Sequence, residues 1–337
     1  MVFAQPLPGA PGKLLDEQGQ PHCGKFSGSL PQLDWSALAQ PHSRSALWRY
    51  FHHKRWQYVA LATEDIFCGI AIVDLGWINT AFAYAFDRRQ GKEVGSLSQD
   101  GIPGLTASIG PQPATGAASN FSFLGKQISY RHDAVSNSYQ LRLRGPQFDI
   151  DANIDANAAA PFLLAVGPVR GGTVHATQKS GGMPLYGEVR AFGKRYTLDG
   201  GVASFDYSSG FLGRETSWCW ASAHGLDIGF NLQAGYFGEQ ENALWLDGQL
   251  FSLGPAHFEF NPADPMAPWH ITTSDGLLDL WFQPEGLRRE DKNLLIAASR
   301  YVQPIGTFSG WVKSGPDAQP RQVNKLAGVT EDHFSRW

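Results

Sequence analysis

Short apolar runs separated by turn residues recur along most of the chain. From Trp56 onward, RWQYVALAT, IFCGIAIVDL and WINTAFAYAF are rich in β-branched and aromatic residues and are cut by Glu-Asp and Leu-Gly breaks. In YQLRLR, the side chains of Tyr139, Leu141 and Leu143 fall on one face of an extended strand, and polar side chains fall on the other. This alternation is typical of antiparallel strands with one face in water.

The same pattern continues through the second half of the chain, for example in ALWLDGQLF, HFEFN and LLDLWFQ. Asp247-Gly248, between two apolar runs, predicts a tight hairpin. Roughly eighteen short strands without a comparable helical pattern favour two antiparallel barrels or sandwiches over one. We therefore predict an all-β fold of two barrels or strongly bent sheets packed together, with domains at residues 46–190 and 191–337.

Two segments lack this pattern. Residues 1–45 are rich in Pro, Gly and Ser and predict an extended N-terminal arm with one short helix near Asp34–Ala39. Residues 88–119 are polar and glycine-rich, and we predict a long loop. A loop of that length in a compact domain is usually functional or disordered, and the pattern leaves open whether it forms a lid.

The composition narrows the class of protein. Hydrophobic residues make up 42% of the 337 positions and charged residues only 17%, so a large core is available. A net charge of -4 without a basic stripe argues against nucleic acid as a partner. Three cysteines without a CxxC pair indicate reduced thiols and a cytoplasmic location. The N-terminus lacks a signal-peptide pattern, and no apolar run approaches the ~20 residues of a membrane-spanning helix.

Motifs for nucleotides, metals and activated nucleophiles are missing from the sequence. It contains no GxxxxGK[ST] phosphate loop, no GxSxG elbow and no HxH or HExxH pair. We therefore predict no cofactor and no metal. A ligand set assembled from distant strands is the alternative to isolated structural histidines; its members would be His175, His224, His257 and His270.

The segment from Asp206 to Ser222 concentrates the chemistry-bearing residues. Trp218 and Trp220 are two positions apart, so both indoles point to one face of a strand. They form either the wall of a pocket or part of a core. Asp206 either lines a site or caps a turn through Ser208-Ser209-Gly210, or pairs with Arg214.

Carboxylates near aromatic residues are the candidates for acid/base chemistry, because burial raises the proton affinity of a carboxylate. The candidate proton donors and acceptors are Asp206, Glu188, Glu241 and His224. The candidate substrate-binding residues are Trp218, Trp220, Arg214, Asn231 and His175. Structural roles as ion pairs, core or hydrogen-bonded groups are the competing interpretation for each of them. The terminal cluster Glu331–Trp337 is either solvated or tied down against the barrels.

Several motifs together resemble one family. The signature D-Y-S-x-G-x-x-x-R-x-T-x-W-x-W-A-S, then I-G-F-N-L, E-N-A-L-W-L-D-G and the closing G-V-T-E-D-H-F-S-R-W, resembles the domain of unknown function 2804. The TQK at Thr177–Lys179 fits as well. This family looks distantly similar to two-domain lipocalin-like proteins of the carotenoid 1,2-hydratase type and certain pericyclic cyclases. The resemblance implies two β-barrels and an apolar substrate. The histidine- and tryptophan-rich motif associated with the hydratase is absent, so its reaction does not carry over.

Three functions remain as hypotheses. The first is a cofactor-independent hydratase, isomerase or cyclase that acts on an isoprenoid- or lipid-like molecule in an aromatic-lined cavity. The second is a non-catalytic carrier of a hydrophobic ligand, which needs the cavity but no acid/base pair. The third is a carbohydrate-active β-sandwich that uses two carboxylates.

Overall fold

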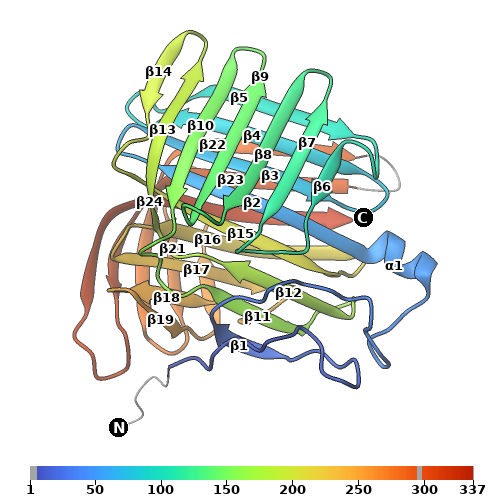
Figure 1. Cartoon of the computed structure of the whole chain (residues 1–337). Helices are drawn as coiled ribbons and strands as arrows, with labels where there is room; N and C mark the ends of the chain where they lie inside the picture. The colour runs from blue at the N-terminus through green and yellow to red at the C-terminus, as the bar shows by residue number, and fades with distance from the viewer. Residues whose placement is uncertain (1–5, 294–297, 337) are drawn as a thin grey trace.

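The computed structural model describes residues 6–293 and 298–336, and within them the fold is almost entirely β. The strands form two antiparallel sheets, and one short helix, α1 (Ala46–His52), projects from one end of the molecule (Figure 1). The prediction of an all-β protein built from two barrel-like units is confirmed. Among the described residues, no helix is long and apolar enough to cross a membrane.

The first sheet contains fifteen strands in the described residues, with the main order β5-β4-β3-β2-β15-β13-β10-β9-β8-β7-β6. Its end strand β6 contacts β2 and β3, and β10 contacts β5, so the sheet curves into a nearly closed barrel. The strands in this path are β2 (His53–Ala62), β3 (Ile66–Asp74), β4 (Asn79–Asp87), β5 (Lys92–Gly101), β6 (Ala107–Ile109), β7 (Ala118–Phe123), β8 (Lys126–Asp133), β9 (Ser138–Gly145), β10 (Phe148–Asp155), β13 (Met183–Ala191) and β15 (Gly201–Phe211). Beside the path lie β1 (Gly24–Ser27), β11 (Leu163–Pro168), β12 (Val174–Lys179) and β14 (Lys194–Thr197).

The second sheet has nine strands in the described residues, in the order β19-β18-β17-β16-β24-β23-β22-β21-β20. It forms a half-barrel around its own core, which includes Phe230, Trp269, Phe282 and Phe308. The strands are β16 (Glu215–His224), β17 (Ile228–Gly235), β18 (Ala243–Leu246), β19 (Gln249–Ser252), β20 (Ala256–Glu259), β21 (Trp269–Thr273), β22 (Leu278–Asn293), β23 (Ala298–Val312) and β24 (Arg321–Arg336).

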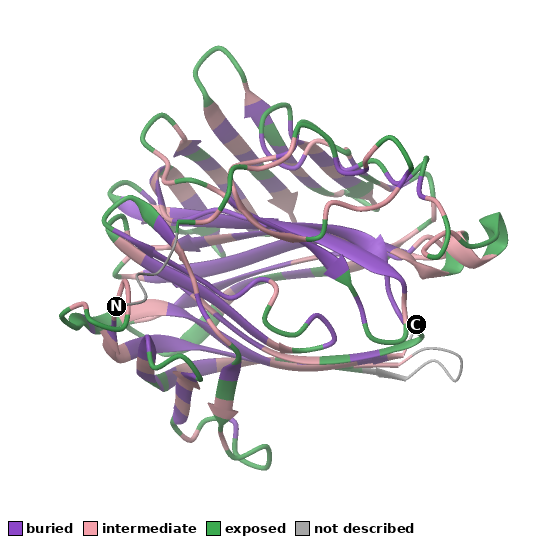
Figure 2. Cartoon of the chain, turned by 90° about the horizontal axis from the view of Figure 1, so that it is seen from below, coloured by how far each residue is buried: buried purple, intermediate pink, exposed green. Residues whose placement is uncertain are grey.

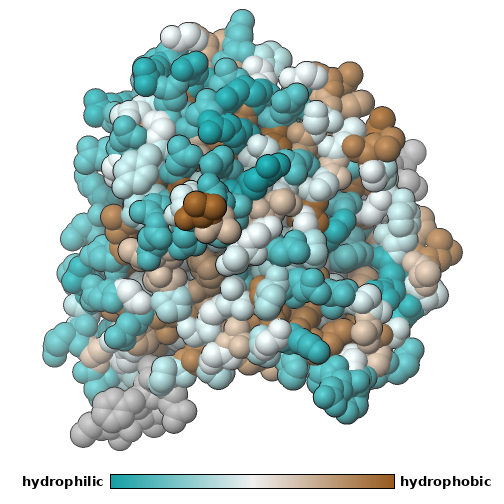
Figure 3. Space-filling view, in the orientation of Figure 1, coloured by the Kyte–Doolittle hydropathy of each residue, from teal (hydrophilic) through white to brown (hydrophobic). Residues whose placement is uncertain are grey.

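Local sequence pattern accounts for much of this arrangement. Tyr139, Leu141 and Leu143 of β9 are buried in the core of the first barrel, as the alternation predicts. Asp247 and Gly248 join β18 to β19, both with positive φ (50° and 77°), so the predicted hairpin is confirmed. Figure 2 shows buried residues along the strands in the middle of the molecule, and Figure 3 shows one mainly hydrophilic face with separate hydrophobic patches.

The prediction of a long loop over residues 88–119 is wrong, because this stretch contains β5 and β6 and leads into β7. In β5, Gly95 and Leu97 are buried while Ser96 and Ser98 are exposed. Buried and exposed positions therefore alternate along β5, but most of these positions hold small or polar residues. The ring of Phe148 fills the space above Gly95. The result is an amphipathic strand with little hydrophobic signal.

The helix predicted near Asp34–Ala39 is also wrong. Asp34 accepts a hydrogen bond from the backbone N–H of Ser36 through Oδ1, and the segment forms turns. The helix comes later, at Ala46–His52, where the side chain of Ser45 caps it by accepting from the N–H of Trp48.

The N-terminal arm connects the two sheets. Its strand β1 pairs with β11 of the first sheet. Lys25 of the same strand donates hydrogen bonds to Ser252 Oγ at the end of β19 and to the carbonyl of the next residue, Leu253, both at 2.9 Å. Along the chain, the change from the first sheet to the second comes between Phe211 and Glu215, whereas residue 190 lies within β13.

Candidate active site between the two sheets

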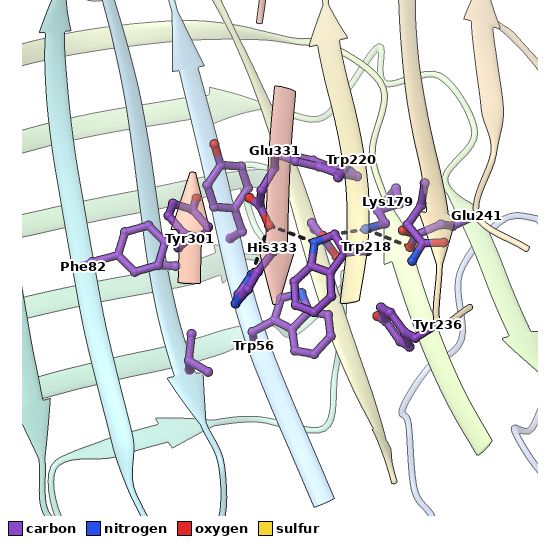
Figure 4. Close-up of a pocket in the computed structure, with 15 residues that line it drawn as sticks. Trp56, Phe82, Lys179, Trp218, Trp220, Tyr236, Glu241, Tyr301, Glu331 and His333 are labelled. Atoms are coloured by element: carbon purple, nitrogen blue, oxygen red, sulfur yellow. Dashed lines mark hydrogen bonds and ion pairs between the residues drawn. The ribbon is translucent and has the colours of Figure 1, made fainter. Parts of the chain in front are cut away.

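A cavity of about 120 Å³ lies between the two sheets and draws its walls from both (Figure 4). The first sheet supplies Trp56, Tyr58, Ala71, Val73, Phe82, Lys179 and Asp206. The second sheet and its connections supply Trp218, Trp220, Gln233, Tyr236, Glu241, Tyr301, Glu331 and His333. A second cavity of about 160 Å³ shares four of these residues, Val73, Phe82, Tyr301 and His333, so the two are neighbours in one cleft.

Two tryptophans of β16 form part of the aromatic wall. Trp218 and Trp220 both line the cavity, as the two-residue spacing on a strand predicts. The indole N–H of Trp220 donates to Asn231 Oδ1 at 2.8 Å, and the Asn231 amide donates to the Glu241 carbonyl at 2.9 Å. Asn231 therefore fixes the Trp220 ring and the backbone at Glu241 from behind the wall.

A buried lysine stands between two carboxylates at one side of the cavity. Lys179 Nζ lies 2.5 Å from Asp206 Oδ2 and 3.0 Å from Glu241 Oε2. Lys179 comes opposite Asp206 in the β12–β15 ladder, and Glu241 arrives from the connection between β17 and β18. The hydroxyls of Thr177 and Ser208 donate to Asp206 Oδ1 at 3.2 and 3.3 Å. The predicted turn through Ser208-Ser209-Gly210 is wrong, because these residues continue β15.

This cluster can hold an additional proton. Burial raises the pKa of Glu241 above its ordinary value, Lys179 opposes the shift, and the charge of Asp206 adds to it. Burial alone would lower the pKa of Lys179, but the two carboxylates outweigh burial and hold that pKa above its ordinary value. Lys179 therefore stays charged, and Glu241 holds a proton more readily than an ordinary carboxyl group does.

A second polar cluster comes from one face of β24. Glu331 accepts hydrogen bonds from the Trp218 indole at 2.8 Å and from the Gln303 amide at 3.1 Å. His333 Nδ1 lies 3.3 Å from Glu331, and its Nε2 lies 2.7 Å from Ser335 Oγ. The His333 and Trp218 rings are 4.0 Å apart between centroids. Histidine and carboxylate thus form an oriented pair in the wall of the first cavity, and His333 also lines the second.

Tyrosine hydroxyl groups extend the polar surface of the cavity. Burial raises the pKa of Tyr301 well above its ordinary value, and neighbouring Glu331 raises it further. Burial does the same to the pKa of Tyr236, with Glu241 as the next cause. Both phenols therefore remain neutral hydrogen-bond donors at physiological pH.

The structure brings together only part of the residue set predicted from sequence. Asp206, Glu241, Trp218 and Trp220 line the cavity. Glu188 lies on β13 outside it and forms ion pairs with two arginines of its own hairpin, Arg190 and Arg195. Arg214 is exposed in the connection between the sheets, and the cationic partner of Asp206 is Lys179.

The two predicted histidines lie behind the walls. His224 contacts Ser222 Oγ at 3.1 Å and packs against Trp245. His175 packs against Trp56 and Tyr236, both of which line the cavity. Burial, with a smaller effect of Lys179, lowers the pKa of each histidine to about 3. Among the described residues, no group of three or more His, Cys, Asp or Glu side chains could hold a metal ion.

Lys179, Glu331 and His333 are the charged or titratable groups of the acid/base clusters that the sequence did not single out as site residues. Lys179 belongs to the TQK motif, which serves only as a family signature. Glu331 and His333 belong to the terminal polar cluster, which the sequence predicts to be either solvated or tied down, and the structure places both on β24. The available signal was the spacing of Glu331 and His333, which places both on one face of a strand. Lys179 had no such local signal, because its partners come from distant parts of the chain.

Comparison with known proteins agrees with the fold. The family model described as Domain of unknown function (DUF2804) matches residues 8–337. No curated protein matches the chain. Kievitone hydratase from Nectria haematococca has a similar structure, with 11% identity, a TM-score of 0.53, and coverage of 100% of this chain and 98% of that one. CghA solved with Sch210972 is also similar, with 11% identity, a TM-score of 0.59 and 97% of each chain covered.

Proposed function

Because this chain belongs to the DUF2804 family, whose description assigns no activity, we propose its function from the cavity: a cofactor-independent enzyme that performs acid/base chemistry on a largely apolar small molecule. The observation that carries the proposal is Glu241, a buried carboxyl group of raised pKa in an aromatic-walled cavity. Hydration, isomerisation or cyclisation of an isoprenoid- or lipid-like substrate fits such a site.

The chemical step begins with proton donation. Glu241 in its neutral form transfers a proton to one carbon of a polarised double bond, and the electron pair of that bond forms the new C–H bond. Positive charge then develops on the other carbon. The faces of Trp218, Trp220 and Tyr236 stabilise that charge, as aromatic rings do for cations.

The second half of the reaction needs a base. In a hydration, water attacks the cationic carbon and gives its proton to His333, which Glu331 orients and stabilises as a cation. In an isomerisation, His333 removes a proton from the neighbouring carbon instead. In either reaction Glu241 loses one proton and His333 gains one. A proton therefore passes from His333 back to Glu241 before the next turnover.

The comparisons support this class of reaction without assigning a substrate. Kievitone hydratase carries a hydratase activity in its name, and it shares the fold over the full length of this chain. The likeness supports the use of this fold for water addition.

Isotope labelling tests the proposal. The protein is incubated with a panel of prenylated and terpenoid alkenes in H₂¹⁸O, and products are analysed by mass spectrometry for uptake of labelled water or for isomers of unchanged mass. We expect Glu241→Gln and His333→Gln each to lower turnover by at least about a hundredfold, as loss of general acid or base catalysis does. Glu188→Gln, outside the cavity, is the matched control and should keep full turnover. Full turnover by both cavity variants would refute the assignment.

A non-catalytic carrier is the second candidate, and one observation favours it. The three carboxylates at the cavity, Asp206, Glu241 and Glu331, all have partners within the protein, as purely structural groups would. Native mass spectrometry of freshly purified protein, before and after incubation with lipid extract, separates the two functions. Unaltered ligand recovered from the complex supports the carrier, and converted ligand supports the enzyme.

A further inference from the structure

The second cavity adjoins the first and has a buried cation, Arg288, in its wall. It is lined by residues of β3, β4 and β5 from the first sheet and of β22, β23 and β24 from the second. Val73, Phe82, Tyr301 and His333 line both cavities. A ligand long enough to pass these four residues would therefore occupy both spaces.

Arg288 is the buried cation. Its side chain is only 10% exposed. The guanidinium carbon lies 4.0 Å from the ring centroid of Phe82, 4.8 Å from that of Tyr301 and 5.8 Å from that of Tyr84. One terminal nitrogen donates to Glu290 at 2.9 Å. Among the described residues, no other acceptor contacts this guanidinium, although the group carries five N–H donors.

This geometry suits an anion that approaches the edge of the guanidinium. Aromatic rings cover its flat surface, where they stabilise the cation but accept no in-plane hydrogen bonds. The N–H groups at its edge match the two oxygens of a carboxylate. Asp100, Glu290 and Arg336 also line the cavity, so charges of both signs are present, and Arg288 is the buried cation stacked on the aromatic wall shared with the first cavity.

The strand register gives the length of the ligand. Glu290, two residues from Arg288 on β22, pairs with Tyr301 on β23, which pairs with His333 on β24. Neighbouring strands lie about 4.8 Å apart, and the two-residue step from Arg288 to Glu290 adds about 7 Å along the strand. An anion at Arg288 would therefore be separated from His333 by roughly 12 Å. An aliphatic chain of about ten carbons covers that distance.

We propose that the ligand of this cleft is an amphiphile whose carboxylate binds Arg288 while its apolar body extends past Phe82 and Tyr301 into the first cavity. The proposal rests on the proposed function and adds a substrate class to it. The anionic end anchors the molecule, and the carbons that lie about 12 Å from the carboxylate reach the acid/base groups.

Two unreactive probes of the same length test the inference. Decanoate and decan-1-ol are titrated into the full-length protein at about pH 8, where the acid is ionised, and binding is followed by quenching of tryptophan fluorescence and by calorimetry. We expect wild-type protein to bind decanoate at least about tenfold more tightly than decanol, since a charge-assisted hydrogen bond is added. Arg288→Gln should abolish this preference and leave decanol binding unchanged.

Two further variants keep the outcome interpretable. Arg289→Gln removes the same charge from the neighbouring, exposed position of β22 and should keep the preference. Arg288→Gln combined with Glu290→Gln removes both partners of the ion pair, so that neither is left buried without the other, and it should lose the preference. Equal affinity of wild type for both probes, or a preference retained without Arg288, overturns the inference while the apolar cavity stands. If neither probe binds, the proposed function fails together with it.

Discussion

Replacement of Lys179 by methionine tests the charge balance at the cavity wall. Methionine is a flexible residue that fills the space of the lysine stem, but the substitution removes the cation that Asp206 and Glu241 share at 2.5 and 3.0 Å. These carboxylate side chains are only 13% and 5% exposed.

The size of the effect follows from the distances. With an effective dielectric constant of about 20, unit charges at the 3.0 Å of the Lys179–Glu241 contact attract by roughly 5–6 kcal/mol. Desolvation of the lysine and repulsion between the carboxylates offset part of this, and breaking a buried pair typically costs about 3–5 kcal/mol. We expect Lys179→Met to lower the free energy of unfolding by this amount at about pH 8.

The loss should depend on pH in a defined direction. Burial already raises the pKa of Glu241, and loss of Lys179 raises it further. In the window above the ordinary carboxyl pKa, the folded variant holds a proton that the unfolded chain has released. Stability of the variant therefore falls as pH rises through that window, and its deficit relative to wild type is smaller near pH 5 than near pH 8.

Urea unfolding followed by tryptophan fluorescence at both pH values provides the measurement. Arg321→Met breaks the exposed ion pair with Asp227 and serves as the control, with an expected loss below about 1 kcal/mol. A triple variant, Lys179→Met with Asp206→Asn and Glu241→Gln, removes all three charges and should recover most of the loss. The reasoning is refuted if Lys179→Met costs no more than the control, or costs the same at both pH values.

Three other predictions concern single side chains. Gly286→Ala should cost about 1–3 kcal/mol of unfolding free energy, because its Cβ would come within 2.1 Å of the Phe86 ring; Gly12→Ala, with open space around it, should be neutral in the same urea assay. Trp218→Phe keeps a ring in the wall but removes the 2.8 Å bond to Glu331, at a cost of about 1.5–3 kcal/mol in urea unfolding; a loss near zero would contradict this bond. The ring signals of His224, whose pKa burial lowers to about 3, should not shift in NMR spectra between about pH 5 and 8; titration near 6.5 would show that the ring is not buried.

The sequence was most informative where function depends on one strand. Trp218 and Trp220 share a face because they are two residues apart, and the structure places both at the cavity. The hairpin at Asp247-Gly248 needed only local turn chemistry. Features of this kind are determined by neighbours in the chain, so the order of residues is enough to predict them.

Contacts between distant strands were harder to predict. Lys179 meets Asp206 only through the pairing of β12 with β15, and no periodicity indicates that pairing. For the same reason Arg214, close to Asp206 in sequence, was a natural but mistaken partner. Strand β5 escaped detection because Gly95 and the serines beside it resemble a loop in composition, although their burial alternates.

The position of the cavity follows from how each sheet buries its apolar side chains. The first barrel and the half-barrel each close around a separate core. A smaller cluster lies between them, where Tyr58 and Phe86 meet Trp220 and Val329.

The path of the chain then brings polar groups to this junction between the sheets. Strand β15 ends the first sheet with Asp206 on it, and β16 opens the second with Trp218 and Trp220. The segment that links the sheets therefore supplies a carboxylate from one side of the cleft and aromatic faces from the other. Neither sheet alone contains the site, so a change that weakens packing between the sheets, such as Gly286→Ala, should impair ligand binding even though Gly286 lines neither cavity.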